Sequence, residues 1–325
     1  MMTKNLKKIS ISIFALLSSF MVNGQFQIDN LDEIPKIKKG ITYITMTDPQ
    51  ASSAKDYIDL FKKHWTFSKI EFIKYSDIDK YLLPGNFFLT INGYQATWTP
   101  NSAMYKEGSP KISIDYGHTR LYLELWTCSE RYFKKKKKND LENMDRLGVA
   151  RIELFTDFLT ILDPKNIYSG NYDGDGHIRN WGLGVLKNYL EQLMINLQNS
   201  TKKVLSDEIA INTKLKELKK QTLYVPDYVL IKFNKFTGEE SGKNEEAAIF
   251  KDYKSDYKII SGKDLNDKIL NSKTPFYYLI YINSGSEKYI NVINSENGEV
   301  IYSKYTEVSY NIKSEDLKDL FKKVN

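Results

Sequence analysis

The stretch Asn171-Tyr-Asp-Gly-Asp-Gly176 holds the residues best suited to bind a cation. Its acids alternate along the chain and a glycine follows them, as in loops that surround calcium with converging oxygen atoms. Asp173 and Asp175 are therefore the candidate metal ligands, with Ca²⁺ as the ion. The complete calcium-loop pattern fails, because Gly182 stands where a bidentate glutamate is required. A solvated turn is the alternative, and no other cofactor is predicted.

Aromatic side chains beside loops form the second group of candidates. Trp98 and Trp181 border loop-forming segments, where an indole could stack on a sugar. Packing in the core or across strands is the ordinary reason for aromatic residues in such sequences. These two residues are the candidates for ligand contact.

No complete catalytic pattern is present in the sequence. It contains neither a Gly-x-Ser-x-Gly turn nor a His-Glu-x-x-His pair. Its three histidines, His64, His118 and His177, are scattered, and the single cysteine, Cys128, has no identifiable partner. Gly238 to Asn244 departs from a phosphate-binding loop in the spacing of its glycines. The sequence therefore predicts no catalytic residues and favours a role without catalysis.

The first 24 residues are typical of a signal peptide. Three lysines precede an apolar run from Ile9 to Val22, and Gly24 supplies the small residue that a cleavage site requires. The run is shorter than the ~20 residues that a membrane-spanning helix needs, and no later run is long enough. We expect a periplasmic or secreted protein whose mature chain has no transmembrane segment.

Charge and cysteine content narrow the choice of partners. The formal net charge is +6, and removing residues 1–24 takes away three lysines and no acids, which leaves +3. A chain this close to balance is not typical of a nucleic-acid binder. One cysteine cannot form an intramolecular disulfide, so stability must come from the core that 41% hydrophobic residues supply. A protein or envelope component is the expected partner, with a glycan as the alternative.

Several local patterns predict secondary structure. Lys288 to Tyr305 is expected to be a β-hairpin, because Asn297-Gly298 separates two runs rich in Tyr, Ile and Val. Lys111 to Trp126 is interpreted as a looser copy of it. Asn92-Gly93 predicts another tight turn. Asp140 to Leu162 has apolar residues at helical spacing and is predicted as a helix.

The second half of the chain repeats features of the first half. Two strand-like segments and one short helical start recur in the same order, with gaps between them. The matches are Lys38–Ile44 with Lys219–Val225, Asp77-Ile78 with Asp264-Leu265, and Phe87–Ile91 with Tyr277–Tyr281. The sequence therefore predicts that one folding unit occurs twice.

The expected fold is α/β or α+β, with two similar tandem units that each contain a small mixed β-sheet and flanking helices. Residues 1–24 are the expected signal peptide and 25–165 the first unit. A Gly/Asp-rich loop with connecting helices is expected at 166–218, and the second unit at 219–325. The favoured function is an exported, non-enzymatic binding or envelope-assembly protein. The alternatives are an envelope hydrolase that uses the loop carboxylates and a glycan-binding module.

Overall fold

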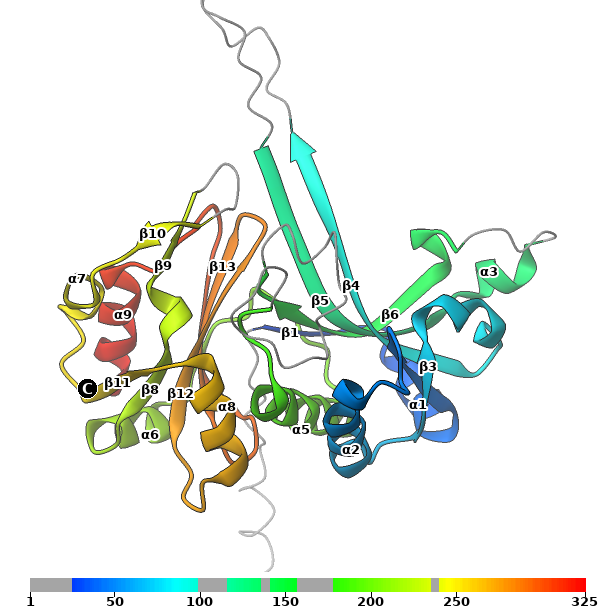
Figure 1. The fold of residues 1–325 in the computed structure, drawn as a ribbon, viewed down its shortest axis with the longest axis horizontal. Coiled ribbons are helices and arrows are strands. Elements are labelled where there is room, and N and C mark those ends of the chain that lie inside the picture. Colours follow the sequence, from blue (N-terminus) through cyan, green and yellow to red (C-terminus); the bar gives the residue numbers. More distant parts are fainter. Residues whose placement is uncertain (1–24, 99–115, 136–140, 157–177, 235–239) are drawn as a thin grey trace, which may run out of the picture.

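The chain forms a mixed α/β structure with two six-stranded sheets (Figure 1). The computed structural model describes residues 25–98, 116–135, 141–156, 178–234 and 240–325. Within these ranges, no helix has the length and apolar character that crossing a bilayer requires. The predicted fold class, with one mixed sheet in each half of the chain, is confirmed.

The first sheet has the strand order β3-β2-β4-β5-β6-β1. Strand β2 is parallel to both β3 and β4, and every other neighbouring pair is antiparallel. Its strands are β1 (Phe26–Ile28), β2 (Ile41–Met46), β3 (Lys69–Lys74), β4 (Asn86–Trp98), β5 (Tyr116–Cys128) and β6 (Arg146–Leu154). Its helices are η1 (Leu31–Glu33), α1 (Ile34–Lys39), η2 (Ser52–Ala54), α2 (Lys55–His64), η3 (Tyr75–Tyr81), α3 (Glu130–Lys134) and η5 (Asn143–Asp145).

The second sheet has the strand order β11-β8-β12-β13-β14-β7. Strand β8 is parallel to both β11 and β12, and the other neighbours are antiparallel, as in the first sheet. Its strands are β7 (Ile209–Ala210), β8 (Leu223–Pro226), β11 (Tyr257–Ile260), β12 (Tyr277–Ser284), β13 (Glu287–Asn294) and β14 (Val300–Thr306). Around it lie α6 (Asn212–Leu215), η7 (Lys216–Lys219), η8 (Asp227–Leu230), the small pair β9 (Ile231–Phe233) and β10 (Glu240–Lys243), α7 (Glu246–Phe250), α8 (Gly262–Asn271) and α9 (Ser314–Val324).

The pairing register agrees with the repeat found in the sequence. The sequence match aligns Thr42 with Leu223, and Phe87 with Tyr277. In the structure Thr42 pairs with Phe87, and Leu223 pairs with Tyr277. Two segments that the sequence matched independently therefore meet in the same register in both units.

A local irregularity also occurs at the same place in both sheets. The register shifts by one residue where β5 meets β6, and again where β13 meets β14. In each case one extra residue, Val149 or Ile301, is left without a partner on the opposite strand. A bulge increases the local twist of a sheet and is normally specific to a fold. Two tandem copies of one folding unit account for its recurrence.

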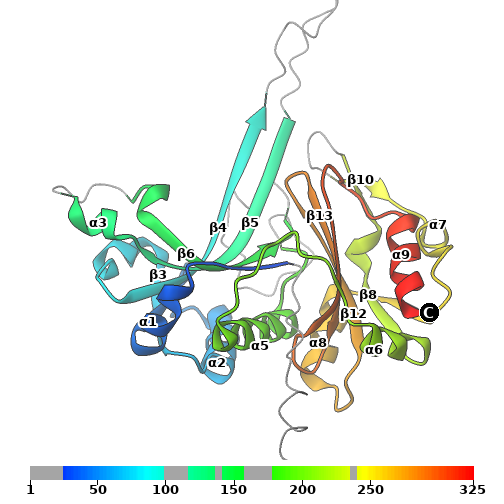
Figure 2. The ribbon, with the colours of Figure 1, turned by 180° about the vertical axis from the view of Figure 1, so that it is seen from behind.

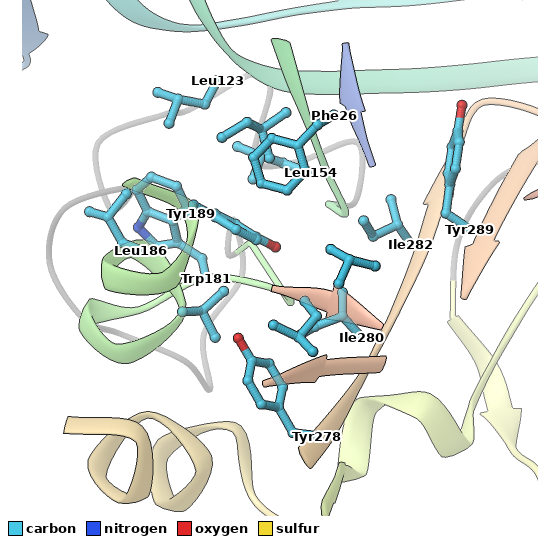
Figure 3. Packing of buried hydrophobic residues seen from close by; sticks show 14 of the residues in the cluster. Phe26, Leu123, Leu154, Trp181, Leu186, Tyr189, Tyr278, Ile280, Ile282 and Tyr289 are labelled. Carbon is cyan, nitrogen blue, oxygen red and sulfur yellow. The ribbon is translucent and has the colours of Figure 1, made fainter. Parts of the chain in front are cut away.

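Helix α5 (Leu183–Asn199) lies between the two sheets (Figures 1 and 2). It follows the first unit and packs against α2 on one side and α8 on the other. Figure 3 shows Tyr189 and Leu186 of this helix between side chains of the first sheet, such as Leu154, and Tyr278 and Ile280 of the second. The buried apolar side chains of both units belong to one continuous cluster.

Helix α9 occupies in the second unit the place that α5 occupies in the first. Each follows the last long strand of its unit, β14 or β6. Leu317 and Leu320 on the inner side of α9 are fully buried. Helix α5 differs in covering a face of each sheet, which explains why 11 of its 17 residues are buried.

Three predictions of turns can be compared with the observed strands. The hairpin predicted at Lys288–Tyr305 is confirmed, since β13 pairs with β14 across the Asn297-Gly298 turn. Its proposed copy at Lys111–Trp126 is wrong, because Tyr116–Cys128 is one uninterrupted strand; the true counterpart is the β5–β6 pair. The turn predicted at Asn92-Gly93 is also wrong. Both residues lie inside β4 and pair with β5, which supplies the partners that a turn would have removed.

The helix predicted for Asp140 to Leu162 is wrong as well. Most of its described part is strand β6, preceded only by the short η5. A short apolar run is compatible with both the helical and the strand periodicity, and the segments that pack beside it decide which one forms. Here β5 and β1 hydrogen-bond to β6 on both sides, which fixes the extended form.

Candidate functional site

The structure locates the predicted site residues only in part. Asp173 and Asp175 lie outside the described residues. Trp98 ends β4, opposite Tyr116, and its side chain also lies outside the description. Trp181 is 4% exposed, and its ring stacks on Tyr57 with 6.4 Å between ring centres, so it packs in the core. Among the described residues, no three acidic, histidine or cysteine side chains gather as a metal site would require.

Two of the remaining titratable candidates, His64 and Cys128, have structural surroundings that explain them, and His177 lies outside the described residues. His64 Nδ1 lies 3.3 Å from a carboxylate oxygen of Glu191 on α5. Cys128 is buried at the end of β5, where it contributes to a small apolar cluster with Tyr132. His118 lies in β5, and its side chain is outside the description.

A different group of residues emerges on one face of the first sheet. Because side chains alternate along a strand, Leu121, Leu123 and Leu125 of β5 point into the core, while Tyr122 and Glu124 point the other way. Neighbouring strands add further polar residues to this second face. We call the group Thr90, Asn92, Tyr122, Glu124, Arg146 and Arg151 the polar face.

Glu124 lies at the centre of the polar face, opposite Thr90 on β4 and Arg151 on β6. Its Oε2 accepts a hydrogen bond of 2.8 Å from Asn92 Nδ2. Its Oε1 lies over Gly148, where an added Cβ would come within 3.0 Å of it. Burial raises the pKa of the Glu124 carboxyl, although the Asn92 hydrogen bond and the charges of Arg146 and Arg151 act in the opposite direction. The protonated form of the Glu124 carboxyl is therefore favoured more than it is in water.

Arg146 flanks Glu124 at one end of the polar face. Its guanidinium carbon lies 4.8 Å from the centre of the Trp126 ring, a favourable cation–π arrangement. Its Nε is buried, and no described residue accepts a hydrogen bond from its guanidinium. Buried hydrogen-bond donors rarely lack an acceptor. The Arg146 guanidinium is therefore held in place by the Trp126 ring, while its donors have no acceptor among the described residues.

Arg151 flanks Glu124 on the next strand. Its guanidinium carbon lies 3.7 Å from the centre of the Tyr122 ring, and its Nε donates to a carboxylate oxygen of Glu153. The other oxygen of that carboxylate accepts a hydrogen bond from Ser284 on β12. Arg151 Nη2 is buried without an acceptor among the described residues. The second unit thus anchors this arginine through Glu153 and leaves part of its donor capacity unused.

Strands β4 and β5 continue beyond the polar face as a two-stranded ribbon, which stands out from the body of the molecule (Figures 1 and 2). At its base Arg120 forms an ion pair of 3.0 Å with Glu287 on β13. Tyr94, which pairs with Arg120, is 47% exposed. An isolated two-stranded ribbon is only marginally stable in water, so this ion pair supports it.

The equivalent face of the second unit has a different character. The shared register places Ile280 at the position of Thr90 and Ile282 at that of Asn92. Asn291 and Ser303 likewise replace Glu124 and Arg151. This second face is buried, and helix α5 lies against it, where Tyr278 donates to Asn188 Oδ1. In the first unit the same positions carry charge, and Tyr122, Glu124, Arg146 and Arg151 stay partly exposed.

Sequence reasoning missed the polar face. Its residues come from three strands that only the sheet brings together, and two of them belong to the segment that was predicted as a helix. The one local signal was a glutamate between Leu123 and Leu125, in a run that otherwise alternates leucine with aromatic residues. Comparisons with protein-family models, curated proteins and solved structures give no match for this chain.

Proposed function

We propose that the protein is an exported, non-enzymatic binding protein that holds its partner on the polar face of the first sheet and along the β4–β5 ribbon. The observation that carries this proposal is the contrast between the two units. In the second unit the equivalent positions are uncharged and buried, and α5 lies against that face. In the first unit it is charged and partly exposed.

The chemistry of the face favours recognition over catalysis. Arg146 and Arg151 are each stacked on an aromatic ring, which holds their donors in place before a partner arrives. Preorganised arginines and aromatic residues are enriched where proteins bind other proteins. Glu124 adds one acid–base group. The second carboxyl of this face, Glu153, accepts hydrogen bonds from Arg151 and Ser284, and the hydroxyl of Thr90 accepts them from Asn92 and Trp126, so both already have partners.

Export is supported by the N-terminal sequence. The three lysines, the apolar run to Val22 and Gly24 follow the order of a signal peptide. The chain has one cysteine, which cannot form an intramolecular disulfide, and such a chain is compatible with either the periplasm or the outside of the cell. A protein or envelope component is the partner that we propose for the polar face.

Site-specific photocrosslinking tests this proposal with a matched control. A photoreactive phenylalanine analogue replaces Tyr94, which is 47% exposed beside the polar face, or Tyr75, which is 48% exposed at the start of η3. In intact cells we expect a discrete adduct from position 94 and none from position 75. Recovery in both cases of uncrosslinked protein alone, or of the same adducts from both positions, contradicts the proposal.

A glycan is the alternative ligand, because the exposed ring of Tyr94 lies beside hydrogen-bonding side chains on this surface. Titration with envelope glycans while tryptophan fluorescence is followed distinguishes it: saturable quenching that Tyr94→Ala abolishes indicates a sugar. The hydrolase alternative depends on Asp173 and Asp175 and remains a prediction, for which melting with calcium against a chelator is the measurement.

A further inference from the structure

The polar face contains an arrangement suited to one particular chemical group. Along β5, Trp126, Glu124 and Tyr122 follow one another on the same side of the sheet. Arg146 stacks on the first of these residues and Arg151 on the last. The carboxyl of Glu124 thus lies between two guanidinium groups, neither of which forms an ion pair with it.

The unused hydrogen-bonding capacity around Glu124 consists of donors. Arg146 donates to no described residue, and Arg151 keeps Nη2 without an acceptor. Asn92 already donates to Glu124 and to Thr90 Oγ1. A ligand that accepts hydrogen bonds from these donors must supply oxygen atoms and negative charge. A carboxylate meets both conditions, because arginine binds planar carboxylates through two parallel hydrogen bonds.

The net charge of the site determines when it can bind such an anionic group. Arg151 is balanced by Glu153, whereas Arg146 is balanced only when Glu124 is ionised. The other described groups around Glu124 are Thr90 and Asn92 on β4 and Gly148 on β6, which carry no charge, and the phenol of Tyr122. A proton on Glu124 therefore leaves a net positive site and converts its carboxyl from an acceptor into a donor.

We propose that the polar face binds a carboxylate of the partner, an aspartate or glutamate side chain, between Arg146 and Glu124, and that Glu124 takes up a proton as the carboxylate binds. This inference rests on the proposed function and specifies its chemistry. The bound carboxylate accepts hydrogen bonds from the Arg146 guanidinium and from the protonated Glu124. The only covalent bond that forms is the O–H bond of Glu124, and its proton comes from solvent.

The direction of the pH dependence follows from this linkage. Burial already raises the pKa of Glu124 above its ordinary value, and a neighbouring anion raises it further. Affinity is then greatest below the Glu124 pKa of the free protein. It falls about tenfold per pH unit above that pKa, until the higher pKa of the complex is reached.

The test uses N-acetyl-glutamate amide as the probe, with binding followed by NMR of the arginine Nε–H signals at pH 5.0 and pH 7.5. In the wild-type protein we expect the Arg146 signal to shift on titration and the affinity to be higher at pH 5.0 than at pH 7.5, by up to about tenfold per pH unit above the Glu124 pKa of the free protein. Glu124→Gln, which is permanently uncharged, should bind with the higher affinity at both pH values. Arg146→Gln should lose binding by at least tenfold.

Arg131→Gln is the matched control for charge. Arg131 is 51% exposed and pairs with Glu142, next to the site but outside it, and its loss should leave probe binding unchanged. Thermal melting of each variant confirms that it is folded. Equal loss in the Arg131 and Arg146 variants, a pH dependence that persists in Glu124→Gln, or inorganic phosphate bound as tightly as the probe each overturns the inference. If position 94 crosslinks to a partner but the probe does not bind, the proposed function stands and the inference that the site binds a carboxylate is wrong.

Discussion

Replacing Gly298 by alanine should destabilise the protein well beyond the ordinary cost of a turn substitution. Gly298 has φ +71°, a left-handed conformation that costs an alanine about 1 kcal/mol. An added Cβ would also lie 2.2 Å from the carbonyl oxygen of Asn188 on α5. That oxygen belongs to the backbone of a buried helix and cannot rotate away, so overpacking adds about 1–3 kcal/mol. The expected loss is about 2–4 kcal/mol in total.

Gly85 provides the control for this experiment. It has φ +85°, and nothing lies within 4 Å of the position its Cβ would take, so Gly85→Ala carries only the conformational cost of about 1 kcal/mol. Urea denaturation, followed by circular dichroism, gives the free energy of unfolding for both variants. Equal losses in the two variants would refute the reasoning, because they would show that α5 does not rest on the turn between β13 and β14.

Two further predictions concern buried charges. Lys203 is 1% exposed with no acceptor for its Nζ among the described residues, and burial lowers its pKa to about 8, against the influence of Asp207. Because an unfolded lysine titrates near 10.4, the unfolded chain holds a proton that the folded one lacks between about pH 8 and 10.4, and stability rises with pH across this window. Lys203→Met should gain about 1–3 kcal/mol at pH 7 and flatten that rise, as urea midpoints at pH 7 and 9.5 would show; a loss at pH 7 contradicts the argument. Lys288 and Asp316 form an ion pair of 2.5 Å with side chains 2% and 6% exposed. Lys288→Met alone should therefore cost about 3–5 kcal/mol, because it leaves the Asp316 carboxylate buried without its nearest cation. The Lys288→Met/Asp316→Asn double variant removes that charge and keeps a side-chain oxygen for the Lys313 backbone N–H, so it should recover part of the loss; no recovery would contradict the argument that the unpaired charge causes it.

The features that sequence reasoning captured are those with local causes. Asn297-Gly298 determines its own turn, and the amphipathic spacing of Leu317 and Leu320 determines α9. The tandem repeat was visible because Lys38–Ile44 and Lys219–Val225 have similar compositions and lead into equivalent strands, β2 and β8. In each case a few neighbouring residues suffice.

The features that it missed depend on partners distant in the chain. Strand β6 was predicted as a helix, and only pairing with β5 and β1 makes it extended. Asn92-Gly93 has the composition of a turn, yet both residues pair with the neighbouring strand β5 and stay extended. Glu124 and Arg146 are 22 positions apart and meet only across the sheet, so no spacing rule could have joined them.

Helix α5 has a consequence for any attempt to divide the chain. A fragment that starts after Asn199 would lack this helix and lay bare Tyr278, Ile280 and Ile282, which are among the most deeply enclosed side chains of the second sheet. A fragment that ends there would keep the helix but expose the side of it that normally meets that sheet. The two halves share one arrangement of strands, yet neither covers its own apolar surface when it is alone. Truncation at Asn199 should therefore yield an insoluble fragment from each half.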